Sequence, residues 1–542
     1  MFTLLLGCVI PCGTGTHVEN GTCVANGLTD TGVVGDSAGG DSGDSDTDSD
    51  TDSDTDTDTD TDTDTDTDTD TDTDTETDTD TDTDTDTDTD TDSPAARWSG
   101  DTRLPSGHTL KGQRANDYAG SALAFGDFDG DGQDDVLVGA EGSTESTTYG
   151  GAVYWVRGPV TGDVDLKDAD AILGGEVAYD WAGSSMAALG DIDGDGKDDA
   201  VVGGTTGSIA GTVHVLHGIA AGSADLADVA DVWTGEGSVD AAGGDVAAAG
   251  DVTGDGARDV LIGAAGSSTY KSYGGAAYVI SGTSTGGGGL HSATVRIYGD
   301  TASMDLGQAV IGGRDVDGDG VDDIVVGGGG SVSGAGAAYV FHGPLSGNVL
   351  ASSADAVVQG HAYYWAVASQ SGTLALGDFD GDGSVDLAVG APRFGDGSAS
   401  DDYRGAVLVV NSANLTGSLD LVLADAQMEG TTSYDSAGGR VASPGDLDGD
   451  GRDDLLVSAS GASPHGSGSG QTYLLYGPFA SGKLDDLADA RFQGDSARWA
   501  AGWSTGGGTD VTGDGIRDLA IGAYEATGDA DYSGEVFILP GT

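Results

Sequence analysis

Cysteine and cationic side chains are both scarce in this chain. Only three cysteines occur among 542 residues, Cys8, Cys12 and Cys23, so the chain beyond its start is not held together by disulfides. Lys and Arg total 19 against 93 Asp and Glu, which gives a formal net charge of −74. Such a charge repels phosphate groups, so nucleic acids and anionic membranes are excluded as electrostatic partners, whereas metal cations are favoured.

Aromatic residues and long apolar runs are also few. Aromatic side chains make up 6% of the chain, and no segment reaches the ~18 consecutive apolar residues of a membrane-spanning helix. Glycine, in contrast, is abundant, with 98 residues. This composition suits many tight turns and closely packed strands better than a helical core.

Residues 1–40 carry the three cysteines behind a short apolar start. Residues 1–8 read like the end of an export signal, and residues 5–8 resemble a bacterial lipoprotein box in which Cys8 would become the lipidated N-terminus. That cleavage would leave Cys12 and Cys23 to pair with each other. The alternative is an arbitrary apolar start with one odd thiol, and the sequence leaves both interpretations open. Contact with a membrane is expected only through a lipid on Cys8.

Residues 41–96 form a second segment of extreme composition. From position 44 to position 92 every second residue is acidic and the others are Thr or Ser, which gives 25 carboxylates and no apolar side chain. A segment with nothing to bury stays disordered, and charge repulsion extends it. We therefore predict a disordered linker that holds the following domain, residues 97–542, away from an anchored start. The alternative is a repeat that arose by slippage and has no selected role.

Seven related units fill residues 97–542. Each contains a version of GDFDGDGQDDVLVGA, as first written at residues 126–140, and its opening aspartate recurs every 60 to 68 residues. Each unit also holds four short strand-like runs, which in unit 2 are residues 184–189, 200–202, 212–216 and 231–234. Four strands repeated at this period are typical of propeller blades. The sequence therefore predicts an all-β fold, a seven-bladed β-propeller of four-stranded antiparallel blades.

The ends of the repeat region predict how the ring closes. Units 1 to 6 each continue into a fourth strand, but unit 7 has none after its third strand at residues 535–539. An orphan copy of the fourth-strand motif, residues 109–112, precedes unit 1. We expect it to fill the missing outer position of the last blade and so leave no open gap in the ring.

The acidic loop of each unit presents oxygen donors at positions 1, 3, 5 and 9, a glycine at position 6 and a backbone carbonyl at position 7. Position 1 is Asp127, Asp191, Asp251, Asp315, Asp378, Asp446 and Asp510. Position 3 is Asp129, Asp193, Thr253, Asp317, Asp380, Asp448 and Thr512. Position 5 is Asp131, Asp195, Asp255, Asp319, Asp382, Asp450 and Asp514. Position 7 is Gln133, Lys197, Ala257, Val321, Ser384, Arg452 and Ile516. Position 9 is Asp135, Asp199, Asp259, Asp323, Asp386, Asp454 and Asp518.

These donors predict calcium sites. Clustered carboxylates without a nearby His or Cys select a hard cation, and Ca²⁺ is favoured over Mg²⁺ because it accepts six to eight oxygens with flexible geometry. The loops are not EF-hands, because position 12 is Val or Ile instead of a bidentate Glu. We expect up to seven Ca²⁺ ions, bound most weakly in units 3 and 7, where Thr253 and Thr512 remove a ligand charge. A single loop of this kind could equally be an acidic turn, but seven copies in register argue against that alternative.

The units resemble FG-GAP repeats, as in the propeller of integrin α-subunits, over about residues 105–542. Residues 390–392, Gly-Ala-Pro, preserve the second half of that signature, whereas the first half is mostly Ala-Gly, as at residues 119–120 and 182–183. The resemblance implies a propeller with divalent-cation sites. It also implies an extracellular protein that serves adhesion or recognition.

A partner is expected on the face of the ring opposite the calcium loops. The crossovers between units and the second turns would gather there, and they carry aromatic residues that suit a protein or glycan ligand. These residues are Tyr118, Tyr149, Tyr179, Trp181, Tyr270, Tyr273, Tyr363, Tyr364, Trp365, Tyr403, Tyr434 and Trp499. The alternative is that they only pack between blades.

We therefore interpret the chain as a monomeric, exported calcium-binding propeller for recognition or adhesion, and not as an enzyme. The eight histidines are scattered, and no nucleophile elbow, phosphate loop or zinc signature occurs. Two alternatives stay open, a carbohydrate-active hydrolase or lyase built on a propeller and a structural component of the cell envelope.

Overall fold

The computed structural model describes residues 98–204, 210–330, 334–361, 365–395, 402–528 and 530–541, together with two strands near the start. The chain divides into two compact units, Met1–Thr87 and Asp88–Thr542. In the first unit β1 (Thr16–Glu19) pairs antiparallel with β2 (Thr22–Ala25), which carries Cys23. The predictions about Cys8, Cys12 and the acidic linker lie outside the described residues.

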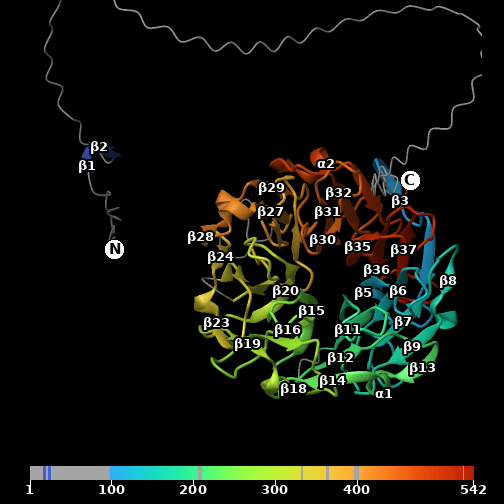
Figure 1. The fold of residues 1–542 in the computed structure, drawn as a ribbon. Coiled ribbons are helices and arrows are strands. Elements are labelled where there is room, and N and C mark those ends of the chain that lie inside the picture. Colours follow the sequence, from blue (N-terminus) through green and yellow to red (C-terminus); the bar gives the residue numbers. More distant parts are fainter. Residues whose placement is uncertain are drawn as a thin grey trace, which may run out of the picture. The chain divides into compact units, whose positions relative to one another are not determined.

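The second unit is the predicted propeller, a ring of seven sheets (Figure 1). The first strands of the blades, in order, are β5 (Ala119–Gly126), β10 (Ser185–Gly190), β15 (Ala242–Gly250), β20 (Leu306–Arg314), β25 (Leu374–Gly377), β30 (Val441–Gly445) and β35 (Ser504–Thr509). The second strands are β6 (Asp135–Ala140), β11 (Asp199–Gly204), β16 (Asp259–Ala264), β21 (Asp323–Gly328), β26 (Asp386–Ala391), β31 (Asp454–Ala459) and β36 (Asp518–Ala523). The third strands are β7 (Ala152–Val156), β12 (Thr212–Leu216), β17 (Ala276–Ser281), β22 (Ala337–Phe341), β27 (Ala406–Val410), β32 (Gln471–Leu475) and β37 (Glu535–Leu539). The fourth strands are β9 (Ala171–Gly174), β14 (Ala230–Thr234), β19 (Val295–Tyr298), β24 (Ala356–Gln359), β29 (Ala426–Glu429), β34 (Ala490–Gln493) and β4 (His108–Lys111).

Ring closure follows the predicted scheme. The N-terminal strand β4 pairs antiparallel with β37, the third strand of blade 7, with Leu110 opposite Val536. The innermost strands of consecutive blades lie side by side around the ring, and β35 of the last blade lies next to β5 of the first. The two ends of the propeller segment are therefore held in one sheet.

Each blade also has a fifth strand that the sequence analysis missed. A short strand that precedes the fourth strand of the next blade pairs in parallel with the outer edge, as β13 pairs with β9. In blade order these strands are β13 (Gly222–Asp225), β18 (Gly288–Gly289), β23 (Gly347–Leu350), β28 (Gly417–Asp420), β33 (Gly482–Lys483), β3 (Gly100–Arg103) and β8 (Val164–Asp165). The fifth strand covers an edge that would otherwise expose unpaired backbone groups.

In the part of the chain that the structure describes, the helices are single turns, and all but η5, which follows β27 (Ala406–Val410), come directly after an edge strand. They are α1 (Leu226–Val229), α2 (Leu484–Leu487), η1 (Leu166–Asp168), η2 (Leu290–Ser292), η4 (Ala351–Ser353), η5 (Ser412–Asn414) and η6 (Leu421–Leu423). Most of these turns bury one residue, such as Leu226 or Leu484, under the blade, which fastens the edge strand to the core.

The hydrophobic core lies between neighbouring blades rather than inside one. Seven clusters of buried side chains each join two consecutive blades, and one of them combines Leu110, Val136 and Val536 across the closure between blades 7 and 1. The second strands are buried along their whole length because a blade covers them on each side. Their continuous apolar sequence follows from this two-sided burial.

The small residues of the innermost strands allow a close approach between blades. Ser121 Oγ on β5 donates to the carbonyl oxygen of Gly183 in the next blade at 3.0 Å. Ser185 makes the same bond to Gly243, and Ser504 bonds to Gly120 across the closure. A Cβ atom on Gly139 would lie 2.1 Å from the Gly183 oxygen, so only glycine fits there.

Candidate metal centre

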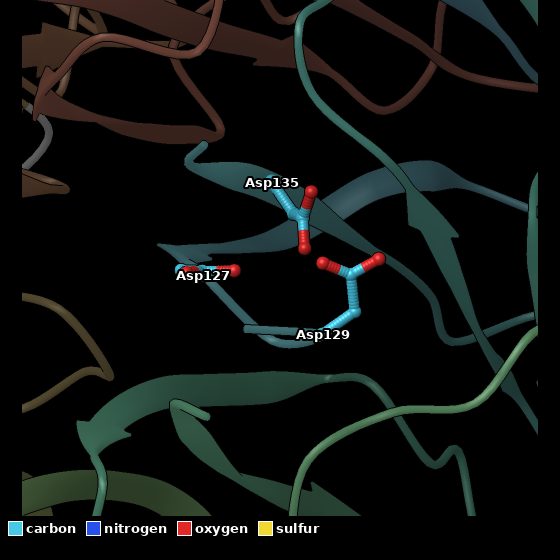
Figure 2. A group of neighbouring side chains, drawn as sticks. All are labelled: Asp127, Asp129 and Asp135. Carbon is cyan, nitrogen blue, oxygen red and sulfur yellow. The ribbon is translucent and has the colours of Figure 1, made fainter. Parts of the chain in front are cut away.

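The acidic loops, called Asp loops below, connect the first and second strands of the blades. In blade 1 the loop runs from β5 to β6, and Figure 2 shows Asp127, Asp129 and Asp135 with their carboxylates gathered around one point. One oxygen atom from each of the three lies within 4.8 Å of the others. Blades 2, 4, 5 and 6 repeat this grouping with Asp191, Asp193 and Asp199; Asp315, Asp317 and Asp323; Asp378, Asp380 and Asp386; and Asp446, Asp448 and Asp454. Positions 1, 3 and 9 thus converge in these blades.

The position 1 carboxylate organises the turn of its own loop. Asp127 Oδ1 accepts hydrogen bonds from the amides of Gly130 and Asp131 at 2.8 and 3.0 Å, and Oδ2 accepts from Gly132 at 2.8 Å. Gly130 and Gly132 have φ values of 77° and 87°, which L-residues rarely adopt. In blade 2 hydrogen bonds from the equivalent amides lower the pKa of Asp191, and the bond from Gly196 has the largest effect. The loop therefore holds this carboxylate charged.

The position 9 carboxylate is buried and ties the loop to the third strand. Asp135 Oδ2 accepts from the Phe128 amide at 3.1 Å and from Trp155 Nε1 at 3.0 Å, while Oδ1 accepts from the Gly158 amide at 2.8 Å. Burial outweighs these bonds and raises the pKa of Asp135 to about 6. Burial also raises the pKa of Asp454 to about 7. These carboxylates are costly to keep charged without a cation nearby.

Position 5 has a different role from the converging three. Asp131 Oδ1 accepts a hydrogen bond from the Gln133 amide at 3.0 Å, and its own amide donates to Asp127 and Asp129. The same bond to position 7 recurs in the other blades, as from the Lys197 amide to Asp195. Asp131 therefore closes the second half of the turn, and one of its oxygens is engaged by the backbone.

Threonine changes the loops of blades 3 and 7 as the sequence suggested. The Thr253 amide donates to Asp259 Oδ2 at 2.9 Å, and the Thr253 hydroxyl lies 3.4 Å from Oδ1. Thr512 makes the same two contacts with Asp518. In these blades a neutral hydroxyl, which is already bonded to position 9, replaces one carboxylate of the group.

Position 8 links most of the loops to the preceding blade, a contact that was not predicted from the sequence; blade 5 is the exception, because its position 8 is Val385. Asp198 Oδ2 accepts from the Asp127 amide at 3.0 Å, and Asp322 accepts from Asp251 in the same way. Arg517 in blade 7 instead donates to the Asp446 carbonyl at 2.9 Å. The Asp loops are thereby joined around one end of the ring, and the arginine at position 8 faces the neighbouring loop rather than its own.

The residue after the third strand lies beside position 3. Arg157 forms an ion pair with Asp129, and its guanidinium sits over the Trp155 ring. His342 Nδ1 lies 3.1 Å from Asp317 Oδ2, and His217 Nδ1 lies 3.5 Å from Asp193. From the sequence these two histidines were only scattered residues, and the expectation that no His lies near the carboxylates is wrong in blades 2 and 4. Their common offset from the third strand was the signal that could have placed them here.

The described aromatic residues that were expected on the opposite face range from buried to exposed. Trp365 is buried against Phe394 at a ring-centroid distance of 4.6 Å, and Trp499 stacks on Phe537 at 5.7 Å, so these two pack within the propeller. Tyr118 and Tyr403 contact other tyrosines, and Tyr363 and Tyr364 lie outside the described residues. The exposed group consists of Tyr149, Tyr179, Trp181, Tyr270, Tyr273 and Tyr434.

Comparison with known proteins identifies the repeat. The FG-GAP repeat family matches residues 119–154, 372–410, 438–475 and 501–539, which lie in blades 1, 5, 6 and 7. Within the described residues, no helix is both long and apolar enough to cross a membrane.

The curated relatives match only part of this chain. Human integrin alpha-IIb is 31% identical over 160 residues, which cover 30% of this chain and 15% of that protein. Integrin alpha pat-2 of Caenorhabditis briggsae is 32% identical over 223 residues, 39% of this chain and 17% of that protein. Phosphatidylinositol-glycan-specific phospholipase D of Dictyostelium discoideum is 32% identical over 105 residues, 19% of this chain and 11% of that protein. The chain thus matches less than a fifth of the length of these relatives.

Proposed function

Because this chain is an FG-GAP β-propeller similar to those of integrin α-subunits, we propose that it is an extracellular recognition module whose Asp loops bind calcium. The observation that carries the proposal is the convergence of three carboxylates, within 4.8 Å of one another, in the loops of blades 1, 2, 4, 5 and 6. A compact set of anionic oxygens that is fixed by backbone amides suits a hard divalent cation.

Calcium fits these loops better than magnesium. Ca²⁺ accepts six to eight oxygens with flexible geometry, whereas Mg²⁺ requires a near-ideal octahedron, and the carboxylates at positions 1 and 9 are already held in place by hydrogen bonds. The cation would neutralise a group in which Asp135 is fully buried. Blades 3 and 7 would bind more weakly, because Thr253 and Thr512 contribute no charge at position 3.

The expected effect of calcium is a stabilisation of the ring at the end that carries the Asp loops. Binding at one site adds about 2.7 kcal/mol to the unfolding free energy when free calcium is a hundred times the dissociation constant. Thermal unfolding of the full chain is to be compared in calcium, in magnesium and in chelator, with the bound ions counted by native mass spectrometry. Five to seven Ca²⁺ per chain and a large fall of Tm in chelator are expected. Equal melting in calcium and chelator with no bound ion would contradict the metal assignment.

The exposed aromatic residues support recognition on the opposite face, here called the crossover face. Trp181 has a φ of 56°, and the equivalent turn positions adopt the same conformation with Ala241, Asp305 and Ala500. The turn therefore does not require an aromatic side chain, and an exposed tryptophan there is not explained by the fold. Aromatic side chains that are held rigidly at a surface are effective contacts for protein and glycan partners.

The partner class can be tested with immobilised panels of matrix proteins and glycans. We expect the full-length chain, as a monomer, to bind at least one member in calcium and to lose the binding in the double variant Tyr179→Ala, Trp181→Ala. Leu423→Ala, at an exposed apolar residue of η6 that is not part of the exposed aromatic group, serves as the control. Equal binding by the double variant and the wild type would show that Tyr179 and Trp181 are not part of the recognition site.

A catalytic function is the second candidate because one relative is named as a phospholipase D. The match to that protein covers 105 residues and only 11% of its length. We therefore favour a non-enzymatic role, with a structural envelope role as the remaining alternative. Release of product from glycosylphosphatidylinositol or polysaccharide substrates by the purified chain would restore the enzyme class.

A further inference from the structure

A cavity of about 490 Å³ opens on the crossover face where blades 5, 6 and 7 meet. Its walls include Gln370 before β25, Arg393 after β26, Arg440 before β30 and Trp503 before β35. All four residues lie at the strand ends remote from the Asp loops. The cavity is therefore separate from the candidate calcium sites.

Two arginines line this one cavity in a protein that has about five acids for each cation. Most of the described lysines and arginines pair with a carboxylate, as Arg103 pairs with Asp495 and Arg491 with Asp101. Arg393 and Arg440 have no such partner within 4.0 Å among the described residues. Two guanidinium groups without a close ion-pair partner therefore line one cavity of an acidic protein.

Arg440 is held in place by its surroundings. Its guanidinium lies 5.7 Å from the centre of the Trp503 ring, and that ring stacks on Tyr524 at 3.9 Å. The Arg440 amide donates to Ser458 Oγ at 2.8 Å, and Nη1 donates to the Gly439 carbonyl at 3.1 Å. Most of the five N–H donors of the guanidinium have no acceptor in the described part of the chain. The group is thus positioned, while its hydrogen-bonding capacity is largely unused.

Two carboxylates, Asp245 and Glu141, lie near enough to act on the charge of Arg440. Asp245 lies in the central channel, in a cavity of about 220 Å³ that Arg440 also lines. Asp245 Oδ2 accepts from the Val310 amide and Oδ1 accepts from Ser371 Oγ, each at 2.8 Å. Asp245 therefore bridges blades 3, 4 and 5. Asp245 and Glu141 both act on the charge of Arg440, but neither forms an ion pair with it within 4.0 Å, so the guanidinium donors stay open to a ligand.

We propose that the Arg393–Arg440 cavity binds the carboxylate of an acidic side chain on a protein partner. The planar fork of a guanidinium matches the two oxygens of a carboxylate. A single negative charge suits the site better than a phosphate or sulfate, because the strongly negative protein repels a multiply charged ligand. Tyr403 on the cavity wall and its neighbour Tyr434 add the tyrosine-rich surroundings that are common in protein interfaces. This inference rests on the proposed recognition function and specifies its ligand chemistry.

The test uses the full-length chain with ¹⁵N-labelled arginine, saturated with calcium at constant ionic strength. The probes are the capped tripeptide Gly-Asp-Gly and its asparagine counterpart Gly-Asn-Gly. We expect the aspartate peptide to shift two arginine Nε signals saturably and the asparagine peptide to shift neither. The signals are assigned with Arg393→Gln and Arg440→Lys, which keeps the charge but loses the fork.

We expect Arg393→Gln to weaken binding of the aspartate peptide about tenfold or more, since a hydrogen bond to a charged group is lost. Arg103→Gln, which removes the same charge at the outer edge of blade 6, should leave the binding unchanged. An equal response to both peptides, or equal weakening by Arg103→Gln, would overturn the proposal. Melting of the same samples with and without calcium separates the two ideas. If calcium raises the Tm but the two peptides give the same response, only the proposed carboxylate site is refuted. If the peptides are distinguished but calcium does not raise the Tm, only the proposed metal sites are refuted.

Discussion

Replacing Asp135 by asparagine tests how a buried loop carboxylate is stabilised. Asp135 is fully buried and accepts three hydrogen bonds, from Phe128, Trp155 and Gly158. An asparagine keeps one acceptor oxygen but turns an NH₂ group toward one of these donors. Leaving a buried donor without an acceptor costs about 1 to 3 kcal/mol.

The same substitution also removes a charge that burial disfavours. The pKa of Asp135 is raised from 3.8 to about 6, and a shift of this size corresponds to about 3 kcal/mol at neutral pH. The two effects oppose each other, so in chelator Asp135→Asn should change the unfolding free energy by less than about 2 kcal/mol. In calcium the variant should also lose the contribution of its site, about 2.7 kcal/mol at a hundredfold excess over the dissociation constant.

The assay is denaturant unfolding of wild type and variant in chelator and in saturating calcium, together with a count of bound ions. We expect the variant to hold one Ca²⁺ fewer and to differ from wild type more in calcium than in chelator. Asp168→Asn, at an exposed carboxylate outside the Asp loops, is the matched control and should behave as wild type. An unchanged ion count, or the same destabilisation in both conditions, would refute the reasoning.

Three further predictions concern ring closure, pH and the weak loops. Leu110→Ala on β4 should destabilise the protein by about 2 to 5 kcal/mol in chemical unfolding, because it opens a cavity between blades 7 and 1, whereas Leu423→Ala at an exposed site should cost under about 0.5 kcal/mol. Burial raises the pKa to about 6 for Asp135, Asp259 and Asp386 and to about 7 for Asp454. Without calcium the folded protein is therefore stabilised when these groups are protonated, and it loses this stability as the pH rises from about 4 to 7. The Tm difference between calcium and chelator should therefore widen from pH 5 to pH 7.5, and an equal difference at both would count against calcium binding at position 9. Thr512→Asp should raise the calcium affinity of blade 7 in calorimetric titrations, while Thr512→Ser should not, and equal affinities would contradict the ligand-charge argument.

Most of the ring could be predicted from the sequence because the strands that pair within a blade are close together in the sequence. The four antiparallel strands of each blade follow one another along the chain, and third strands such as Thr212–Leu216 were placed to the residue. The closure by β4 was also predictable, because an extra fourth-strand motif precedes unit 1 and unit 7 lacks one. The fifth strands were missed because segments such as Gly222–Asp225 are short, exposed and without apolar alternation.

The candidate calcium loops were predicted better than their surroundings. Positions 1, 3 and 9 share one loop, so their spacing indicated convergence, whereas the engagement of Asp131 by the Gln133 amide depends on the turn geometry. The link from Asp198 to the Asp127 amide, and the meeting of Arg393 with Arg440, join residues of different blades. No local pattern marks such pairs, because they depend on how the blades pack in the ring.

The most direct test of the central claim is the melting temperature of the full-length chain in calcium and in chelator, measured alongside the number of bound calcium ions. We predict five to seven ions per chain and a marked fall of Tm when they are removed. Identical melting in both conditions, with no calcium retained, would contradict a calcium-stabilised propeller and would leave the Asp loops as turns held by their own backbone amides.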